Sequence, residues 1–382
     1  MSTQQFQLKR VESKSDWKDF IDLPWMIYKD SPYWVPPLKI AVKDTLDVNK
    51  NPFFKHAWMY PLVAYQNGKC VGRVVGVIDD NHNKYHEEKT AFFGFYEAIE
   101  NQELTDLMLG EVANWAKSKG MNMLRGPMNP STNHECGLLI QGFDDTPSVM
   151  MTYNPPYYAT LLEGWGFAKA KDLNAYYIHG DSKFSEKLIR HSERLKAGGK
   201  VTFRTVDMKK FDQEVETILE IYNDAWEKNW GFVPMNPEEF RHMAKDMKAV
   251  VDPNLLLMCE VRGEPAGFAL ALPDINQALK KVPDGKLLPF GLLKLLWNTK
   301  GPGKKKTLNR CRILTLGIKK AYREVGIGPL LYTEYLTRGP GNGYPTGEAS
   351  WILEDNKPMV RGVEYMKGEL AKVYRIYDKA LS

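Results

Sequence analysis

The stretch that decides the fold is Arg323-Glu324-Val325-Gly326-Ile327-Gly328, which lies between a predicted strand, 312–318, and a predicted helix, 328–337. Gly326 and Gly328 have no Cβ, so the backbone can turn tightly there and direct several N–H groups at one anion. The helix that begins at Gly328 adds unpaired N–H groups and the positive end of its dipole. The pattern predicts a phosphate-binding loop. The alternative is an ordinary loop that contains two glycines.

The order of elements around this loop resembles motif A of the Gcn5-related N-acetyltransferases, the GNAT superfamily. In that family the pattern Q/R-x-x-G-x-G/A joins a strand to a helix and holds the pyrophosphate of acyl-CoA. Arg323, Gly326 and Gly328 fill its three defined positions. An alternating strand at 347–353 and a strand at 373–377 follow in the family's order. The resemblance implies an α/β fold with a mixed sheet and an acyl-CoA-dependent N-acyltransferase, most simply an N-acetyltransferase.

The same order of elements occurs twice along the chain. Hairpin tips with a G-x-x-x-G step occur at 65–72 and again at 261–267. Each is followed by an apolar strand, a helix and further strands. We therefore expect two tandem GNAT-like domains, 1–182 and 200–382, joined by a linker, 183–199, that contains an amphipathic helix.

The two copies differ at the phosphate-binding position. In the first copy the segment between strand and helix is Ile99-Glu100-Asn101-Gln102, which has no glycine and carries a carboxylate. Such a loop repels phosphates and offers no position suited to a positive φ. We therefore expect only the C-terminal copy to hold acyl-CoA.

The resemblance implies a set of cofactor-binding residues in the strand, in the loop and after the next strand: Leu316, Gly317, Ile318, Arg323, Glu324, Val325, Gly326, Ile327, Gly328 and Asn356. Glu354 is the expected general base, with Asp355 next. The family's acid tyrosine falls at Glu364 here, so Tyr365 and Tyr374 are the candidates that remain. The alternative for Asp355 and Asn356 is capping of the following helix.

The acceptor pocket is expected in the segment after the first helix of the second copy. In GNAT proteins this segment lines the acceptor site, and here it gathers aromatic and amide side chains: Trp226, Asn229, Trp230 and Phe232. The alternative is that these aromatic rings fill the seam between domains. In the first copy, a long insertion at 125–136 contains His134-Glu135-Cys136. Substrate contact or local capping explains that triplet better than a catalytic triad, whose members meet through the fold.

A second insertion, 273–309, combines apolar and basic residues. Eight large apolar residues lie between 287 and 297, and nine Lys or Arg residues without an acid lie between 300 and 323. The apolar residues have three possible destinations: a domain interface, an acyl-chain or acceptor pocket, or a membrane surface. The basic residues form a solvated loop or attract the phosphates of a nucleotide.

Composition sets the remaining expectations. The net charge of +5 is interspersed, so no nucleic-acid partner is expected, and four scattered cysteines suggest neither disulfides nor a metal site. With no signal peptide and no long apolar run, we expect a cytoplasmic protein without membrane contact. The expected cofactor is acetyl-CoA or another acyl-CoA, and the expected acceptor is a small-molecule amine or a peptide. The alternative to an enzyme is a non-catalytic acyl-CoA-binding or regulatory protein.

Overall fold

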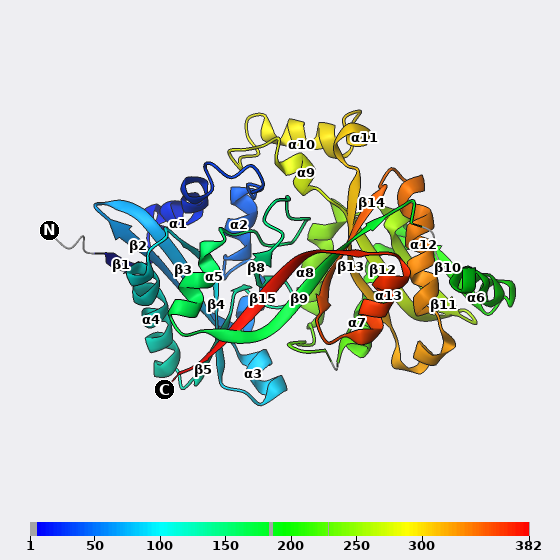
Figure 1. The fold of residues 1–382 in the computed structure, drawn as a ribbon, viewed down its shortest axis with the longest axis horizontal. Helices are drawn as coiled ribbons and strands as arrows, with labels where there is room; N and C mark the ends of the chain where they lie inside the picture. The colour runs from blue at the N-terminus through cyan, green and yellow to red at the C-terminus, as the bar shows by residue number, and fades with distance from the viewer. Residues whose placement is uncertain (1–5, 183–185, 228, 382) are drawn as a thin grey trace. The chain divides into compact units, whose positions relative to one another are not determined.

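The chain divides into two compact units, each described here by itself (Figure 1). The computed structural model describes residues 6–182, 186–227 and 229–381. Unit 1 comprises Met1–Asp172 and Val373–Ser382, and unit 2 comprises Leu173–Lys372. Both units contain a mixed sheet, as expected for the α/β class.

In unit 1, antiparallel strands lead to one parallel pair. The strand order is β1 (Gln7–Arg10), β2 (Ala57–Gln66), β3 (Lys69–Asp79), β4 (Thr90–Ala98), β5 (Met123–Gly126) and β15 (Glu369–Ala380). The parallel pair is β4 with β5, and α4 (Gln102–Ser118) connects the two. Leu104, Met108 and Val112 recur every fourth residue on α4 and are fully buried in the core of this unit. The other helices of unit 1 are α1 (Lys14–Ile27), α2 (Lys39–Thr45), α3 (Asp80–His86) and α5 (Tyr157–Gly164).

Unit 2 repeats this plan. Its strand order is β10 (Val201–Thr205), β11 (Leu256–Val261), β12 (Glu264–Pro273), β13 (Arg310–Ile318), β14 (Thr346–Leu353) and β9 (Ala168–His179). The parallel pair is β13 with β14, and α12 (Gly328–Gly341) connects the two. The other helices are α6 (Glu186–Ala197), α7 (Phe211–Trp226), α8 (Pro237–Lys248), α9 (Asn276–Leu279), α10 (Gly291–Thr299), α11 (Lys304–Thr307) and α13 (Lys357–Tyr365). The strands and helices predicted around the loop at 323–328 and the two hairpins are thereby confirmed. The helix predicted in the linker begins at residue 184, and residues 184 and 185 lie outside the described residues.

The closing strand of each unit comes from the other half of the chain. The end of β9, Leu173–His179, pairs antiparallel with β14 in unit 2. The end of β15, Tyr377–Ala380, pairs antiparallel with β5 in unit 1. The domain boundaries 1–182 and 200–382 stay a prediction. In the structure, the last strand of each copy crosses to the other unit and completes the sheet there, so the two copies exchange their last strands.

Within the described ranges, no helix combines the length and the apolar character needed to cross a bilayer.

Because the end of β15 completes the sheet of unit 1, a substitution that weakens the packing of this end should destabilise unit 1. Tyr377 is fully buried in the core of unit 1, and its hydroxyl donates to Glu163 Oε1 at 3.1 Å. We expect Tyr377→Ala to lower the free energy of unfolding by about 3–5 kcal/mol, as other truncations of large buried side chains do. Hydrogen exchange should show the lost protection in β4 and β5.

The control is Leu370→Ala on the same strand, where the side chain is exposed and the expected cost is below about 0.5 kcal/mol. Protection lost first in β13 and β14 would contradict the exchange.

Candidate functional site

The two parallel strands of unit 2 separate halfway along their length. Their pairing runs from Arg310↔Thr346 to Ile313↔Ala349 and stops there, although β13 continues to Ile318 and β14 to Leu353. Beyond this point β13 stays paired with β12, and the end of β14 pairs with β9. A register shift between β12 and β13 accompanies the separation: Leu270 pairs with Thr315 and Ala271 with Ile313, so β13 has one extra residue, as expected for a bulge that bends a strand. The edge of β13 that faced β14 is therefore left without a strand partner.

The predicted phosphate-binding loop lies at the end of this separated strand. Gly326 has φ +82°, a conformation that side chains with a Cβ rarely adopt, and the loop passes from there into α12. Ile327, the N-cap residue, makes no side-chain capping bond. The N–H groups of Gly326, Ile327 and Gly328 donate no hydrogen bond to any other described residue. These donors and the dipole of α12 form a site suited to an anion.

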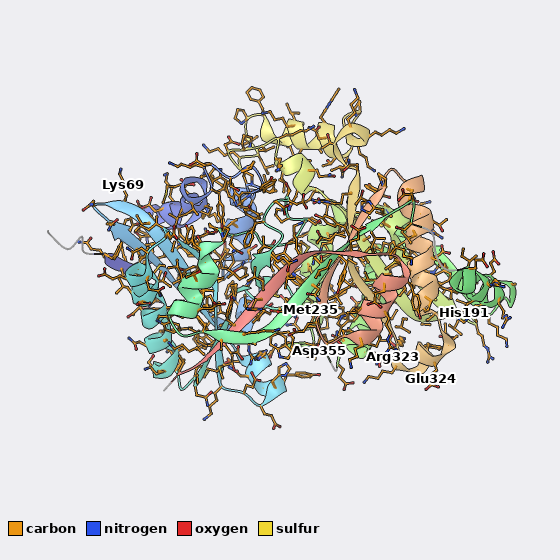
Figure 2. All side chains as sticks on the ribbon, in the orientation of Figure 1. Lys69, His191, Met235, Arg323, Glu324 and Asp355 are labelled. Atoms are coloured by element: carbon orange, nitrogen blue, oxygen red, sulfur yellow. The ribbon has the colours of Figure 1, made fainter. Side chains whose placement is uncertain are left out.

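The charged residues before the loop anchor it. The Arg323 guanidinium donates to the main-chain oxygen of Ala225 at 2.7 Å and to that of Ile318 at 3.5 Å (Figure 2). The N–H of Lys320 donates to Asp224 Oδ2 at 2.6 Å. Arg323 thus fixes the loop to the end of α7 and to β13.

A histidine that the sequence did not single out lies against the loop. A Cβ placed on Gly326 would be 3.0 Å from His191 Nε2 on α6 (Figure 2). The helix is held there by Ser192, whose buried hydroxyl is 3.2 Å from that of Thr333 on α12. The sequence pattern gave only an amphipathic linker helix, and nothing local indicated which element α6 packs on.

The expected acceptor residues gather beside β13. Trp226 lies on the separated strand, because a Cβ on Gly317 would be 2.3 Å from its ring. It stacks on Tyr222 with ring centroids 4.7 Å apart. Phe232 also contacts Tyr222, at 5.7 Å, and is buried, which favours the packing role for this ring. Asn229 closes the turn between them, donating its N–H to the Trp226 oxygen and accepting from Phe232. Trp230 is half-buried.

The expected catalytic residues do not all lie in one unit. Glu354 and Asp355 are exposed at the end of β14, and Tyr365 is 54% exposed at the end of α13. Asn356 caps α13, since its side chain accepts from the Met359 N–H at 3.3 Å. Tyr374 is fully buried and belongs to unit 1, whereas the loop belongs to unit 2. The roles of these residues stay predictions.

A buried polar cluster marks the point where β13 and β14 part. Arg312 and Glu348 are cross-strand partners with almost no exposure. Arg312 Nε donates to Ser350 Oγ at 2.9 Å, and Ser350 Oγ donates to Glu348 Oε1 at 2.8 Å. Sequence reasoning counted Arg312 among solvated or phosphate-attracting charges. Its place inside a predicted strand was the signal that it would be buried.

Polar atoms near this cluster have no partner among the described residues. Thr315 Oγ1 on β13 and Trp351 Nε1 on β14 are both buried and make no hydrogen bond. Both lie on the strand segments that have lost their parallel pairing. An unpaired buried polar atom is costly, so a ligand that hydrogen-bonds there is favoured.

The equivalent position in unit 1 is filled by the chain itself. Pairing of β4 with β5 also stops early, at Phe92↔Arg125. The insertion that follows β5 places β6 (Met128–Asn129) against the separated strand, where Asn129 Oδ1 accepts from the Phe95 N–H at 2.6 Å. A Cβ on Gly94 would be only 1.7 Å from the Met128 oxygen. A ligand has no room at this position.

The N-terminus of α4 is also satisfied internally. Asn101 is its N-cap and accepts from the Leu104 N–H at 2.9 Å, and Glu103 lies in the first turn. Where α12 leaves its first donors free, α4 has a side-chain cap and negative charge. That only the second copy binds an anion stays a prediction, and this difference between the two helices favours it.

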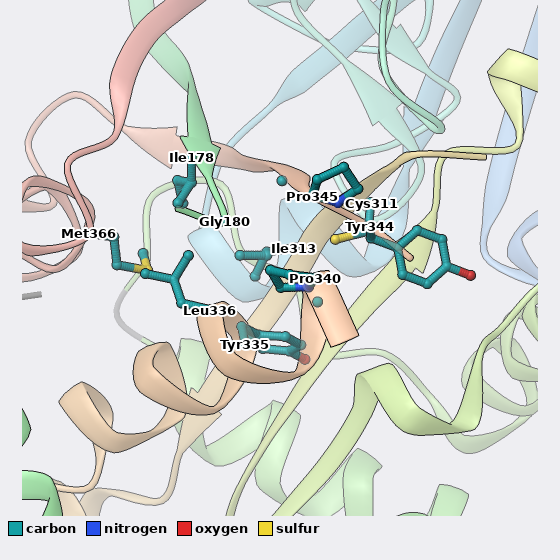
Figure 3. A pocket seen from close by; sticks show the side chains of 12 residues that line it. Ile178, Gly180, Cys311, Ile313, Tyr335, Leu336, Pro340, Tyr344, Pro345 and Met366 are labelled. Atoms are coloured by element: carbon teal, nitrogen blue, oxygen red, sulfur yellow. The ribbon is translucent and has the colours of Figure 1, made fainter. Parts of the chain in front are cut away.

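A small apolar cavity lies between α12 and the sheet of unit 2. It encloses about 20 Å³, close to the volume of one water probe. Its lining includes Ile178, Cys311, Ile313, Tyr335, Leu336 and Met366 (Figure 3). Burial raises the pKa of the Cys311 thiol to about 12, so this cysteine is protonated and not a nucleophile. The part of the chain that is described holds no cluster of His, Cys, Asp or Glu side chains suited to a metal ion.

The fold is that of the tandem GNAT proteins. A tandem GNAT protein from the clavulanic acid biosynthesis pathway superimposes with a TM-score of 0.56 at 12% identity, covering 99% of both chains. A GCN5-related N-acetyltransferase from Sphaerobacter thermophilus gives a TM-score of 0.54 at 12% identity, covering 98% of this chain and 96% of that one. The expected fold and the resemblance are confirmed.

Two curated proteins align with nearly the whole chain. The bacterial ceramide synthase of Caulobacter vibrioides is 37% identical over 376 residues, which is 97% of this chain and 96% of that protein. Protein YghO of Escherichia coli is 35% identical over 375 residues, covering 97% and 94%. No family model matches. The chain belongs to the family that contains the bacterial ceramide synthase and YghO.

The two interpretations of Asn356, helix cap and cofactor contact, predict different effects of its substitution on the free energy of unfolding. Because its side chain caps α13, we expect Asn356→Ala to lower the free energy of unfolding by about 1 kcal/mol, while Asn356→Asp keeps most of it. Chemical denaturation of the three proteins measures this. If Asn356→Ala unfolds like the wild type, the capping bond contributes nothing and a cofactor contact becomes the better explanation.

Proposed function

We propose that unit 2 binds acyl-CoA at the loop 323–328 and transfers the acyl group to an amine. The observation that carries the proposal is the set of unbonded N–H groups at Gly326, Ile327 and Gly328, at the end of a strand that has parted from its neighbour. The loop N–H groups and the α12 dipole would hold the pyrophosphate. The free edge of β13 would accept the amide groups of the pantetheine arm.

The reaction follows from this placement. The amine nitrogen attacks the thioester carbonyl, the C–N bond forms, the C–S bond breaks, and CoA leaves as a thiol after gaining a proton. A main-chain N–H of the segment Leu316–Ile318 would stabilise the oxyanion. Glu354, at the end of β14, would accept the proton of the amine. Tyr365, in the same unit, would donate the proton to the thiolate.

The family membership supports a lipid-like acceptor. The Caulobacter relative is named a ceramide synthase, and a ceramide is the amide of a fatty acid with a long-chain amino alcohol. We infer that this chain joins a fatty acyl group from CoA to the amino group of a long-chain amino alcohol. The GNAT resemblance implies acetyl transfer instead, and the assay described next includes acetyl-CoA to test it. A non-catalytic acyl-CoA-binding protein would use the unpaired atoms of Thr315 and Trp351 in the same way, so turnover is what separates the two functions.

A thiol-release assay on the full chain tests the activity. Acetyl-CoA and palmitoyl-CoA are each offered with sphinganine or with a short amine such as spermidine, and the lipid product is identified by mass spectrometry. The proposal expects the fastest release with palmitoyl-CoA and sphinganine. Release with acetyl-CoA and spermidine alone would contradict the acceptor class, and no release with any pair would favour the regulatory alternative.

A matched pair of glycine variants tests the loop. Gly326 and Gly343 both have a positive φ, so alanine at either position costs about 1–2 kcal/mol in backbone strain. Only Gly326 lies in the loop, and its new Cβ would meet His191, whereas a Cβ on Gly343 meets nothing within 4 Å. We expect calorimetry to show CoA binding weakened about tenfold, equivalent to 1.4 kcal/mol, in Gly326→Ala.

Gly343→Ala should lose stability and keep the wild-type affinity for CoA. Equal affinities in all three proteins would contradict binding at this loop.

A further inference from the structure

The insertion at 273–309 presents an apolar surface to solvent. Between Leu288 and Trp297, six large side chains are 43–74% exposed: Leu288, Phe290, Leu292, Leu293, Leu296 and Trp297. We call these six residues the α10 patch. Figure 1 shows α10 beside α11, outside the strands of unit 2. Of the three destinations expected for this apolar run, neither an interface nor a pocket within unit 2 covers these residues.

The helix is fixed with its apolar side outward. Asn298 is buried, and its Oδ1 accepts from Lys281 Nζ and from Thr307 Oγ1, both at 2.8 Å. Leu295 packs against the core of unit 2. An ordinary surface helix turns its leucines inward and its amides outward, whereas α10 buries the amide of Asn298 and exposes three of its four leucines. The bonds of Asn298 hold this orientation, so the patch is a built feature of the fold.

Positive charge surrounds the patch. Between residues 273 and 309 the chain has eight lysines and two acids, Asp274 and Asp284, and Asp274 is buried in an ion pair with Arg310. Five of these lysines are exposed and form no ion pair with any described residue: Lys286, Lys294, Lys300, Lys305 and Lys306. A second copy docked on the patch would bring two lysine sets together, which like charges oppose. The complementary partner is one that is apolar inside and anionic at its surface.

We propose that the α10 patch inserts into the interfacial layer of a bilayer that contains anionic lipids, with the five lysines at the headgroups. Amphipathic helices with aromatic and leucine side chains on one face and lysines beside them bind bilayers in this way. This replaces the expectation of no membrane contact. The proposal does not depend on which acceptor the proposed enzyme uses.

Vesicle flotation of the full-length protein tests the proposal. Vesicles of phosphatidylcholine with phosphatidylglycerol in equal parts are compared with vesicles of phosphatidylcholine alone. We expect the wild type to float with the anionic vesicles and the double variant Leu293→Glu/Trp297→Glu to bind at least about tenfold more weakly. Lys305→Glu/Lys306→Glu should weaken binding by about fivefold for each lysine removed, and only with anionic vesicles.

The control is Leu370→Glu, which changes an exposed leucine of unit 2 outside the insertion and should bind like the wild type. Binding of CoA, measured by calorimetry, should be the same in every variant, so a failure here is distinguishable from a failure of the proposed function. The proposal would be overturned if the wild type did not float with the anionic vesicles, or if the double variant floated with them as well as the wild type does. Conversion of a dimer to a monomer by the double variant, without vesicle binding, would assign the patch to a second copy.

Discussion

The structure depends on one constraint: when two parallel strands part inside a protein, the hydrogen-bonding groups along their free edges need other partners. Both units contain such a separation, at Phe92↔Arg125 in one and at Ile313↔Ala349 in the other. Unit 1 meets the need with its own chain, through Asn129 and the strand that carries it. Unit 2 has no such insertion after β14, because Asn356 begins α13 almost at once. The same fold thus gives a closed structural unit and an open site.

Exchange of the last strands ties the two copies to each other through the chain. Because β9 and β15 each cross from one unit to the other, neither half of the chain can complete its sheet alone. The first half of the chain supplies β9, whose end pairs with β14 in unit 2. On β14, Glu348 and Ser350 are held beside Arg312. The first copy therefore contributes to the scaffold of the proposed acyl-CoA site.

The sequence predicted the features that local chemistry determines. Glycines at 326 and 328 predicted the turn into α12, and alternation predicted β14. It did not predict contacts between distant segments: the exchange of β9 and β15, His191 against Gly326, or the buried pairing of Arg312 with Ser350 and Glu348. Nor could composition say which side of α10 faces outward, since Asn298 decides that through Lys281 and Thr307. The acceptor and the proton-transfer residues depend on a bound ligand, which no pattern in the chain specifies.

The central claim is that the free main-chain donors before α12 hold the pyrophosphate of acyl-CoA. Hydrogen exchange of the intact protein, resolved to single residues with and without CoA, tests it most directly. The account predicts slower exchange at Gly326, Ile327 and Gly328 when CoA is present, and unchanged exchange at residues 93–104 of the first copy. Slowing at 93–104, or unchanged exchange at the three loop residues under saturating CoA, would contradict it.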